Sequence, residues 1–325
     1  MKTLKKILII GLMLVMCACS SPKQYISYTM YPIGYLLNRI GGDRIQTISI
    51  QDNSMIQRAN INPEFESILQ DSFVLFHIGN IEPYFDIHEE EIIATGVETD
   101  DLSVLNALYD FKRFNLVYVD GKQNFVESSY YEGDIFDNID TYDLDLNIWL
   151  SPTGMRSMAI DVKDYLTSNY VEQSSYFEEN FNTLYDELIV LDAAYNSLAL
   201  KLNSENKTLK FVSMTPSFGC WQKDYGFQVY PVCMSRYGTL PTKDELQIIM
   251  DRIKNDGVKF IAYEPNIPSD MLDLMEYIED ELDLKRINLN NISSLSQSQI
   301  DANKDYLALM YENLSTLESI AAVGD

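Results

Sequence analysis

Short runs of β-branched, aromatic and aliphatic residues alternate with longer segments of helical periodicity along the chain. In the first half, the strand-like runs are residues 25–30, 47–50, 73–76 and 116–119. The second half repeats the pattern at residues 209–214, 228–232, 259–263 and 286–289. Such alternation indicates βα units and mainly parallel sheets. Ligand-contacting groups are expected in the loops that follow the strands at Ile50, Val119, Met214 and Tyr263.

A single long amphipathic helix is predicted between the two halves. Its apolar positions recur at spacings of three and four from Phe177 to Leu202. We therefore expect an α/β protein with two similar lobes, mainly parallel sheets, one long rigid helix and a ligand cleft between the lobes. The expected boundaries are 25–152 for the N-terminal lobe, 153–206 for the connecting helices and 207–325 for the C-terminal lobe. One continuous doubly wound domain with a long surface helix is the alternative.

Residues 120–146 interrupt this rhythm. Acidic residues recur from Glu127 to Asp145 among Gly, Ser, Asn and Tyr, so we expect a long, solvated loop. A cation-collecting loop is the second interpretation, although the segment contains no Asp-x-Asp-x-Asp-Gly calcium motif.

Composition adds a constraint on partners. The chain has 325 residues, of which 46% are hydrophobic, so it is not wholly disordered. Its 24 basic and 49 acidic residues give a net charge of −25, which repels phosphate backbones. We therefore expect a folded protein that does not bind nucleic acid.

The first residues have the layout of a secretory signal. Lysines precede an apolar run at residues 7–16, which is shorter than the roughly 20 residues that span a bilayer. Ala18-Cys19-Ser20 is typical of a bacterial lipoprotein. We expect residues 1–18 to be removed, Cys19 to be lipidated and residues 19–24 to form a tether. The protein would then lie on the outer face of the cell membrane, held by its lipid alone. Cleavage of a plain secretory signal is the alternative.

Several short motifs follow one another in a fixed order. In the first half they are Tyr28–Pro32, Ile40–Asp43, Asn62–Pro63 and Gly79–Pro83. The later ones are Asn147–Pro152, Phe218–Gly219, Glu264–Asn266 and Asp305–Leu314. In order and spacing the chain resembles the metal-type solute-binding lipoproteins of bacterial ABC importers. The resemblance implies a monomer that binds zinc or manganese between its lobes and passes the ion to permease and ATPase subunits.

The resemblance also implies the positions of the metal ligands. Members of this family hold the ion with histidines and a final acidic group. The flanking motifs put Gln57, Asn147 and Thr215 at the histidine positions and Glu264 at the acidic position. Carboxamide and hydroxyl oxygens are poor zinc ligands, so altered or weakened metal binding is expected. A harder ion such as calcium or manganese, or a small polar or cationic organic solute, suits these groups better.

The remaining histidines and cysteines are few. His77 lies within an apolar run and is expected to be packed and hydrogen-bonded, whereas His88 precedes three glutamates on an expected surface helix. Cys220 and Cys233 either form a disulfide in an exported protein or are two buried free thiols.

Two functions are compatible with these residues. The first is the binding component of an ABC importer, with a divalent ion (zinc, manganese or calcium) as the transported ligand. The alternative is a non-transport surface lipoprotein, an adhesin or decoy that keeps the scaffold without metal binding. An enzyme is not expected, because the chain has no Gly-x-Ser-x-Gly elbow, phosphate-binding loop or dinucleotide-binding glycine pattern.

Overall fold

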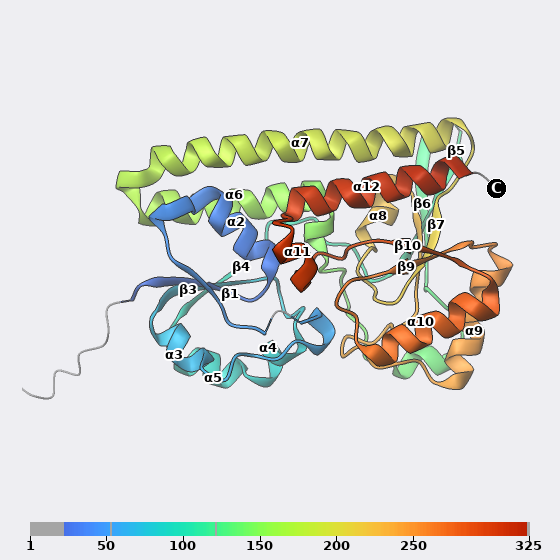
Figure 1. The fold of residues 1–325 in the computed structure, drawn as a ribbon, viewed down its shortest axis with the longest axis horizontal. Helices are drawn as coiled ribbons and strands as arrows, with labels where there is room; N and C mark the ends of the chain where they lie inside the picture. The colour runs from blue at the N-terminus through green and yellow to red at the C-terminus, as the bar shows by residue number, and fades with distance from the viewer. Residues whose placement is uncertain (1–22, 53, 121, 324–325) are drawn as a thin grey trace, which may run out of the picture.

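Two parallel sheets and a set of long helices organise the chain, as the computed structural model in Figure 1 shows. The structure describes residues 23–52, 54–120 and 122–323. The predictions for the signal segment 1–18 and for Cys19 concern residues outside these ranges. Within the described ranges, no helix has both the length and the apolar character that crossing a bilayer requires.

The N-terminal lobe is built on a four-stranded parallel sheet of order β2-β1-β3-β4. Its strands are β1 (Tyr25–Tyr28), β2 (Thr47–Ser49), β3 (Ser72–His77) and β4 (Glu98–Asp101). Its helices and turns are α2 (Tyr31–Gly41), η1 (Gly42–Arg44), η2 (Ile56–Arg58), α3 (Phe65–Gln70), α4 (Pro83–Ile87) and α5 (Glu89–Ala94). Because the strands are parallel, the loops that follow them meet at one edge of the sheet.

The C-terminal lobe repeats this plan with a parallel sheet of order β10-β9-β7-β8. Its strands are β7 (Lys210–Ser213), β8 (Gln228–Pro231), β9 (Phe260–Tyr263) and β10 (Lys285–Asn288). Its helices are α8 (Cys220–Tyr225), α9 (Lys243–Asn255), α10 (Ser269–Leu282), α11 (Gln297–Asp301) and α12 (Tyr306–Val323). Capping boxes at Thr242 and Ser296 fix the starts of α9 and α11.

Two long helices connect the lobes. The turn η4 (Ile148–Leu150) leads into α6 (Pro152–Asn169), and η5 (Val171–Gln173) leads into α7 (Ser174–Ser204). With 31 residues, α7 extends over both lobes in Figure 1. Its buried stripe includes Phe177, Leu188 and Tyr195, as the periodicity predicts, and α2, α6 and α12 pack against it. The prediction of an α/β protein with parallel sheets and a long helix is confirmed.

The sequence predictions for residues 116–119 and for residues 120–146 are both wrong. Residues of β5 (Arg113–Val119) and β6 (Lys122–Ser128) form a separate antiparallel hairpin, so the run at 116–119 is not a strand of the N-terminal sheet. Val119 is 55% exposed and does not lead into a cleft. The expected long loop contains β6 and the turn η3 (Asp134–Asn138). The Asp120-Gly121 dipeptide is a hairpin signal that explains this outcome.

One apolar core passes through both lobes and the connecting helices. It contains Val74 of the N-terminal sheet, Leu188 of α7 and Phe211 of the C-terminal sheet. One smaller apolar cluster lies under the outer helices of the C-terminal lobe, and another lies under those of the N-terminal lobe. The shared core fixes the two sheets relative to the long helices, and it thereby positions the loops at their facing edges.

Candidate functional site

Glu264 directly follows β9 and is fully buried at the edge where β7 also ends. Its Oε1 accepts hydrogen bonds from the backbone N–H groups of Met214 at 2.8 Å and Thr215 at 3.0 Å. Its Oε2 accepts one from Thr215 Oγ1 at 2.5 Å and one from Asn291 Nδ2 at 2.9 Å. Both carboxyl oxygens therefore already have two donors each.

The donors around Glu264 are all neutral. Burial raises the pKa of Glu264, and the hydrogen bonds from Thr215, Asn291 and Met214 oppose that shift. A carboxylate has about four lone-pair positions, and four donors use all of them. A cation could bind Glu264 only by displacing some of these donors.

Thr215 and Asn291 are themselves held in place. Thr215 Oγ1 lies 2.7 Å from Ser217 Oγ. The backbone carbonyl of Thr215 accepts a 2.7 Å hydrogen bond from Ser213 Oγ. The carbonyl of Asn291 accepts a 2.8 Å hydrogen bond from Trp149 Nε1. The structure thus brings Thr215 and Glu264 into direct contact and adds Asn291, which the sequence analysis missed.

Asn147 lies beside the loop that carries Thr215, but it is engaged elsewhere. Its backbone N–H and its Nδ2 each donate to Asp145 Oδ1 at 3.0 Å, and Nδ2 is 3.5 Å from the carbonyl oxygen of Pro216. Its Oδ1 is buried and has no hydrogen-bond partner. Asn147 therefore ties down its own loop and leaves one acceptor unused.

Asp145 is a second buried carboxyl group that the sequence analysis placed wrongly in a solvated loop. Burial raises its pKa to about 6, against the hydrogen bonds from Asn147. Gly219 packs so closely that a Cβ atom there would lie 2.2 Å from Asp145 Oδ2. Asp145 also lines a cavity of about 110 Å³ together with Cys220 and Asp224.

Gln57 lies on η2, where the N-terminal lobe touches the C-terminal lobe. It is buried, and a Cβ atom at Gly238 would lie 3.1 Å from its own Cβ. The adjacent Arg58 donates to both carboxyl oxygens of Asp270 at 2.8 Å and to the carbonyl of Gly238 at 2.7 Å. Among the described residues, Gln57 forms no hydrogen bond with Asn147, Thr215 or Glu264.

A second bridge joins the lobes at Arg236. Its guanidinium forms an ion pair with Asp86 of α4 and approaches the carbonyl of Asn80 at 3.4 Å. Tyr142 donates to the carbonyl of Ile81 at 2.7 Å from the same region. Together with the contact between Arg58 and Asp270, these contacts link the N-terminal and C-terminal lobes.

Neither histidine takes part in the contacts of Glu264. His77 Nδ1 lies 2.8 Å from the carbonyl oxygen of Gly79, and its ring stacks on Phe85 with centroids 4.6 Å apart. His88 is partly exposed, with Nδ1 4.0 Å from Glu91. Both positions agree with the prediction that these histidines are packed or on the surface.

Cys220 and Cys233 are free and buried, so the disulfide considered from the sequence is not formed. The reason is topological, because Cys220 at the start of α8 packs in the shared core, whereas Cys233 after β8 packs in the outer cluster of the C-terminal lobe. Burial raises the pKa of both thiols, that of Cys233 to about 12. They behave as small apolar residues.

Glu82 is a further fully buried carboxyl group that the sequence analysis did not identify as a candidate. It precedes α4, and neither of its carboxyl oxygens has a hydrogen-bond partner. Burial raises the pKa of Glu82 to about 7, and the nearby Thr29 hydroxyl opposes this shift without completing a hydrogen bond. The sequence signal was present, since Glu82 belongs to the motif Gly79–Pro83.

These groups offer oxygen atoms and very little nitrogen or sulphur for a metal. In the part of the chain that the structure describes, no three His, Cys, Asp or Glu side chains are grouped to hold a metal ion. Amide, hydroxyl and carboxylate groups are offered instead by four buried residues, Gln57, Asn147, Thr215 and Glu264. Such groups suit polar recognition better than transition-metal coordination.

The two lobes, the long helix and the polar edge between the lobes define a two-lobed type of binding protein. Residues 26–320 match the family described as "ZnuA: Zinc-uptake complex component A periplasmic", and the chain belongs to this family. It is thus a member of a family of transport components and not of a family of enzymes.

Named relatives agree with this assignment. The "Zinc-binding protein AdcA" of Streptococcus pyogenes serotype M1 is 26% identical over 173 residues, which are 53% of this chain and 32% of that protein. The "High-affinity zinc uptake system protein ZnuA" of Bacillus subtilis (strain 168) is 25% identical over 175 residues, which are 54% of this chain and 53% of that protein. The matches therefore span about half the length of these relatives or less.

Solved structures have the same fold. Zn(II)-bound AdcA from Streptococcus pneumoniae superposes with a TM-score of 0.67 at 19% identity, covering 91% of this chain and 57% of that chain. The laminin-binding protein Lmb of Streptococcus agalactiae gives a TM-score of 0.71 at 15% identity, covering 92% and 99%. FpvC of Pseudomonas aeruginosa in complex with Mn2+ gives 0.67 at 17% identity, covering 93% and 100%.

Proposed function

We propose that the chain is the extracytoplasmic binding component of a metal-type ABC importer and passes its ligand to a permease and an ATPase. Family membership over residues 26–320 and the uptake function in the relatives' names support this proposal. A lipid on Cys19 would hold the protein to the outer face of the membrane, and one relative is named a "Zinc-binding lipoprotein". An exported monomer with two lobes would fit this role.

The proposal includes a changed ligand chemistry in the cleft. The observation that carries it is Glu264, whose two oxygens are occupied by four neutral donors. The positions that the resemblance assigns to histidines hold Gln57, Asn147 and Thr215, so no imidazole stands beside this carboxyl group. Zinc binding is therefore weak, and the cargo is a harder ion such as calcium or manganese, or a small polar or cationic organic solute.

The first experiment measures metal binding by the wild-type chain. Protein purified without chelator is analysed for metals and then titrated calorimetrically with Zn²⁺, Mn²⁺ and Ca²⁺. We expect no tightly retained transition metal and weak zinc binding. A panel of polar and cationic solutes is screened by thermal unfolding, in which a ligand at 100 times its Kd adds about 2.7 kcal/mol of stability. One tightly bound zinc ion per chain would overturn the altered-site proposal.

A gain-of-function variant tests the assigned positions directly. Replacing Gln57, Asn147 and Thr215 together by histidine supplies three imidazoles and removes the Thr215 hydroxyl from Glu264 Oε2. We expect zinc affinity to rise at least about 100-fold, which corresponds to about 2.7 kcal/mol.

Two controls make this gain specific. Adding Glu264→Gln to the triple variant should remove most of the gain. Histidines introduced at the exposed positions Thr183, Asn196 and Gln247 should give none, although the residue types replaced are the same. Equal zinc affinity in the two triple-histidine variants would show that the four positions do not form one site.

The second candidate function is a surface lipoprotein that no longer carries a ligand. The saturated carboxyl group of Glu264 favours it, and the likeness to Lmb, described as having adhesin and metal-transporting activity, gives it a test. Binding to immobilised laminin is compared with binding to albumin at matched ionic strength. Specific laminin binding, together with no response to any ion or solute, would favour this function over import.

A further inference from the structure

A second polar region lies at the opposite edge of the C-terminal sheet from Glu264. There β7 begins at Lys210 and β8 begins at Gln228, beside the hairpin strand β5. A cavity of about 450 Å³ opens between these strands, the end of α7 and the end of α9. We call it the distal pocket, and its charged lining residues are Arg113, Lys207, Lys210, Arg252 and Asp256.

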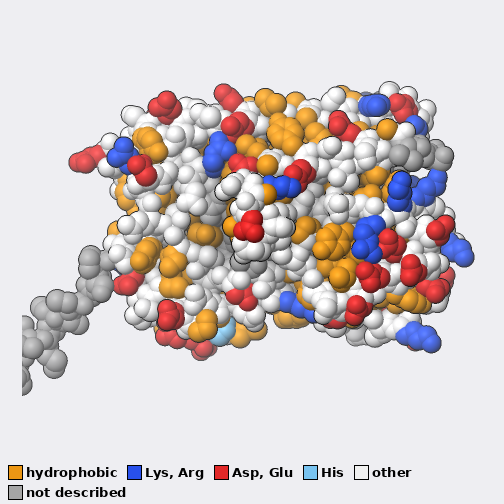
Figure 2. Space-filling view, viewed as in Figure 1, with side chains coloured by type: hydrophobic (Ala, Val, Ile, Leu, Met, Phe, Trp, Pro, Cys, Tyr) orange, Lys and Arg blue, Asp and Glu red, His pale blue; other side chains and the backbone are white. Residues whose placement is uncertain are grey.

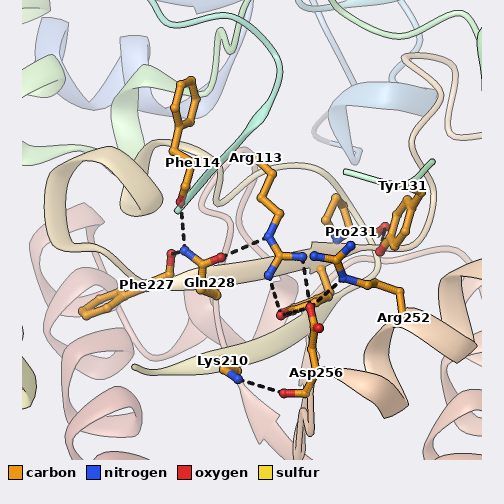
Figure 3. A network of polar contacts seen from close by, with 10 residues as sticks. Arg113, Phe114, Tyr131, Lys210, Phe227, Gln228, Pro231, Arg252 and Asp256 are labelled. Atoms are coloured by element: carbon orange, nitrogen blue, oxygen red, sulfur yellow. Dashed lines mark hydrogen bonds and ion pairs between the residues drawn. The ribbon is translucent and has the colours of Figure 1, made fainter. Parts of the chain in front are cut away.

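Arg113 is the centre of this pocket and is buried (Figure 3). Its Nε donates to Gln228 Oε1 at 3.1 Å, and its Nη2 donates to Tyr230 OH at 2.7 Å. The guanidinium also stacks over the Tyr230 ring, 4.6 Å from the centroid. Gln228 is fixed in turn by a 2.9 Å hydrogen bond to the carbonyl of Phe114. The guanidinium is therefore preorganised before any ligand arrives.

Positive charge exceeds negative charge in the distal pocket. Arg113 and Arg252 share a single carboxyl oxygen, Asp256 Oδ2, at 3.1 and 2.7 Å. Burial alone would raise the pKa of Asp256, but the hydrogen bonds from Arg252 and Tyr230 outweigh it, so the pKa lies below the usual value and Asp256 stays charged.

The lysines of the pocket differ in how far they are neutralised. Lys210 Nζ donates to the backbone carbonyl of Asp256 at 2.8 Å, which leaves its charge uncompensated, whereas Lys207 pairs with Glu205 at 2.9 Å. Two arginines and Lys210 thus share the lining of the pocket with one carboxylate, in a chain whose net charge is −25. Glu132 acts electrostatically on Arg252 but does not line the pocket. In Figure 2 most visible Lys and Arg side chains lie over the C-terminal lobe.

We propose that the distal pocket binds small oxyanions that carry two or more negative charges, such as phosphates or polycarboxylates. Planar guanidinium groups match the geometry of phosphate and carboxylate oxygens, and the two charges in excess call for a dianion. The volume is within the range of small-molecule sites. A purely structural network would neutralise its charges internally. In this network the half-buried Lys210 and the side chain of Arg252 line a cavity.

The test uses the full chain and inorganic pyrophosphate as the probe. Binding is measured calorimetrically at constant ionic strength. Citrate is the second multiply charged anion, and acetate and chloride are the singly charged anions for comparison. We expect saturable binding of pyrophosphate or citrate at one site per chain, and at least tenfold weaker binding of the monovalent anions. Equal, non-saturating responses to all four anions would overturn the proposal.

Variants locate the binding in the distal pocket. Lys210→Gln and Arg252→Gln remove pocket charges without touching buried Arg113, and each should raise the Kd for pyrophosphate about tenfold or more. Lys285→Gln, an exposed lysine at the start of β10 on the same sheet edge, makes the same charge change and should leave the Kd unchanged. Circular dichroism confirms folding of each variant. Affinities that fall equally in all three would show a diffuse charge effect and overturn the site.

The proposal is independent of the cleft. Glu264→Gln should bind pyrophosphate as the wild-type chain does, because Glu264 lies at the end of β9, whereas the pocket lies where β7 and β8 begin. Loss of pyrophosphate binding in Glu264→Gln, with an unchanged fold, would mean that the anion binds in the cleft instead.

Discussion

Two glutamates, one in each lobe, are equally buried but differ in their surroundings. Glu264 accepts four hydrogen bonds, whereas neither oxygen of Glu82 has a hydrogen-bond partner. Burial raises the pKa of both groups, and only at Glu264 do several donors oppose it. The difference teaches that burial alone does not make a carboxyl group a ligand site, because its hydrogen bonds decide whether any lone pairs remain for a ligand.

This difference also separates a structural from a titratable role. Glu264 holds the loop after β7 against Asn291 and so shapes the edge of the C-terminal sheet. Glu82, with a pKa near 7, changes charge close to neutral pH without compensating contacts. Removing these two side chains is therefore expected to change the stability of the protein in opposite directions.

The largest effect is expected for Glu264→Leu. The substitution leaves the N–H groups of Met214 and Thr215 and the amide of Asn291 buried without an acceptor. At about 1–3 kcal/mol for each unsatisfied group, the free energy of unfolding should fall by about 4 kcal/mol or more. Urea unfolding followed by circular dichroism measures the change.

The matched variant for that experiment is Glu82→Leu. Because no donor completes a hydrogen bond with Glu82, the free energy of unfolding at pH 8 should be unchanged or higher. If both leucine variants lost similar stability, the contrast between the two carboxyl groups would be refuted.

The second effect is a pH dependence at Glu82. Its folded-state pKa of about 7 lies above the ordinary 4.5, so the folded protein binds this proton more tightly than the unfolded chain does. The stability contributed by this group is present at low pH and is lost as the pH rises from about 4.5 to about 7. In Glu82→Gln that loss disappears, so the variant should gain about 3 kcal/mol relative to wild type between pH 4.5 and pH 8.

Denaturant unfolding at several pH values measures this gain. The exposed Glu66 provides the control, because Glu66→Gln should follow the wild-type pH profile throughout. Parallel pH profiles for wild type and Glu82→Gln would contradict the raised pKa.

The sequence predicted the fold better than it predicted these environments. Apolar runs mark seven of the eight strands of the two sheets, because buried parallel strands need such runs. The missed strand is β4 (Glu98–Asp101), a polar edge strand that has no apolar pattern and is recruited by pairing with β3. The run at residues 116–119 was assigned to the N-terminal sheet although the Asp120-Gly121 dipeptide that follows it is a hairpin signal.

The site was predictable only at positions that the motifs of the resemblance locate. The resemblance placed Thr215 near Glu264, and the structure joins them, but it did not indicate Asn291, whose contact with Glu264 depends on the packing of β9 against β10. Asp145 lies in an acidic, polar segment, and its burial follows from the Asn147 and Gly219 contacts of the folded loop. The contacts of Asn291 with Glu264 and of Gly219 with Asp145 join residues far apart in the sequence, and such contacts leave no periodic signal in it.

The smallest expected effect concerns the ion pair between Arg58 and Asp270, which links the two lobes. Arg58 on η2 binds both carboxyl oxygens of Asp270 on α10, and this hydrogen bond lowers the pKa of Asp270. Both side chains are partly exposed, so Arg58→Ala should lower the free energy of unfolding by only about 0.5–1 kcal/mol. Local opening should nevertheless increase, because the Arg58–Asp270 contact between the lobes is lost.

Hydrogen exchange at the N–H groups of Met214 and Thr215 reports this opening, because both donate to Glu264. We expect faster exchange at these two amides in Arg58→Ala and unchanged exchange in Arg44→Ala, which removes an exposed ion pair with the adjacent Asp43. If exchange stayed at the wild-type rate, the closed edge would be held by the shared core alone. Faster exchange would show that the hydrogen bonds of Glu264 depend on lobe closure, so a ligand could compete for its oxygens only in the open state.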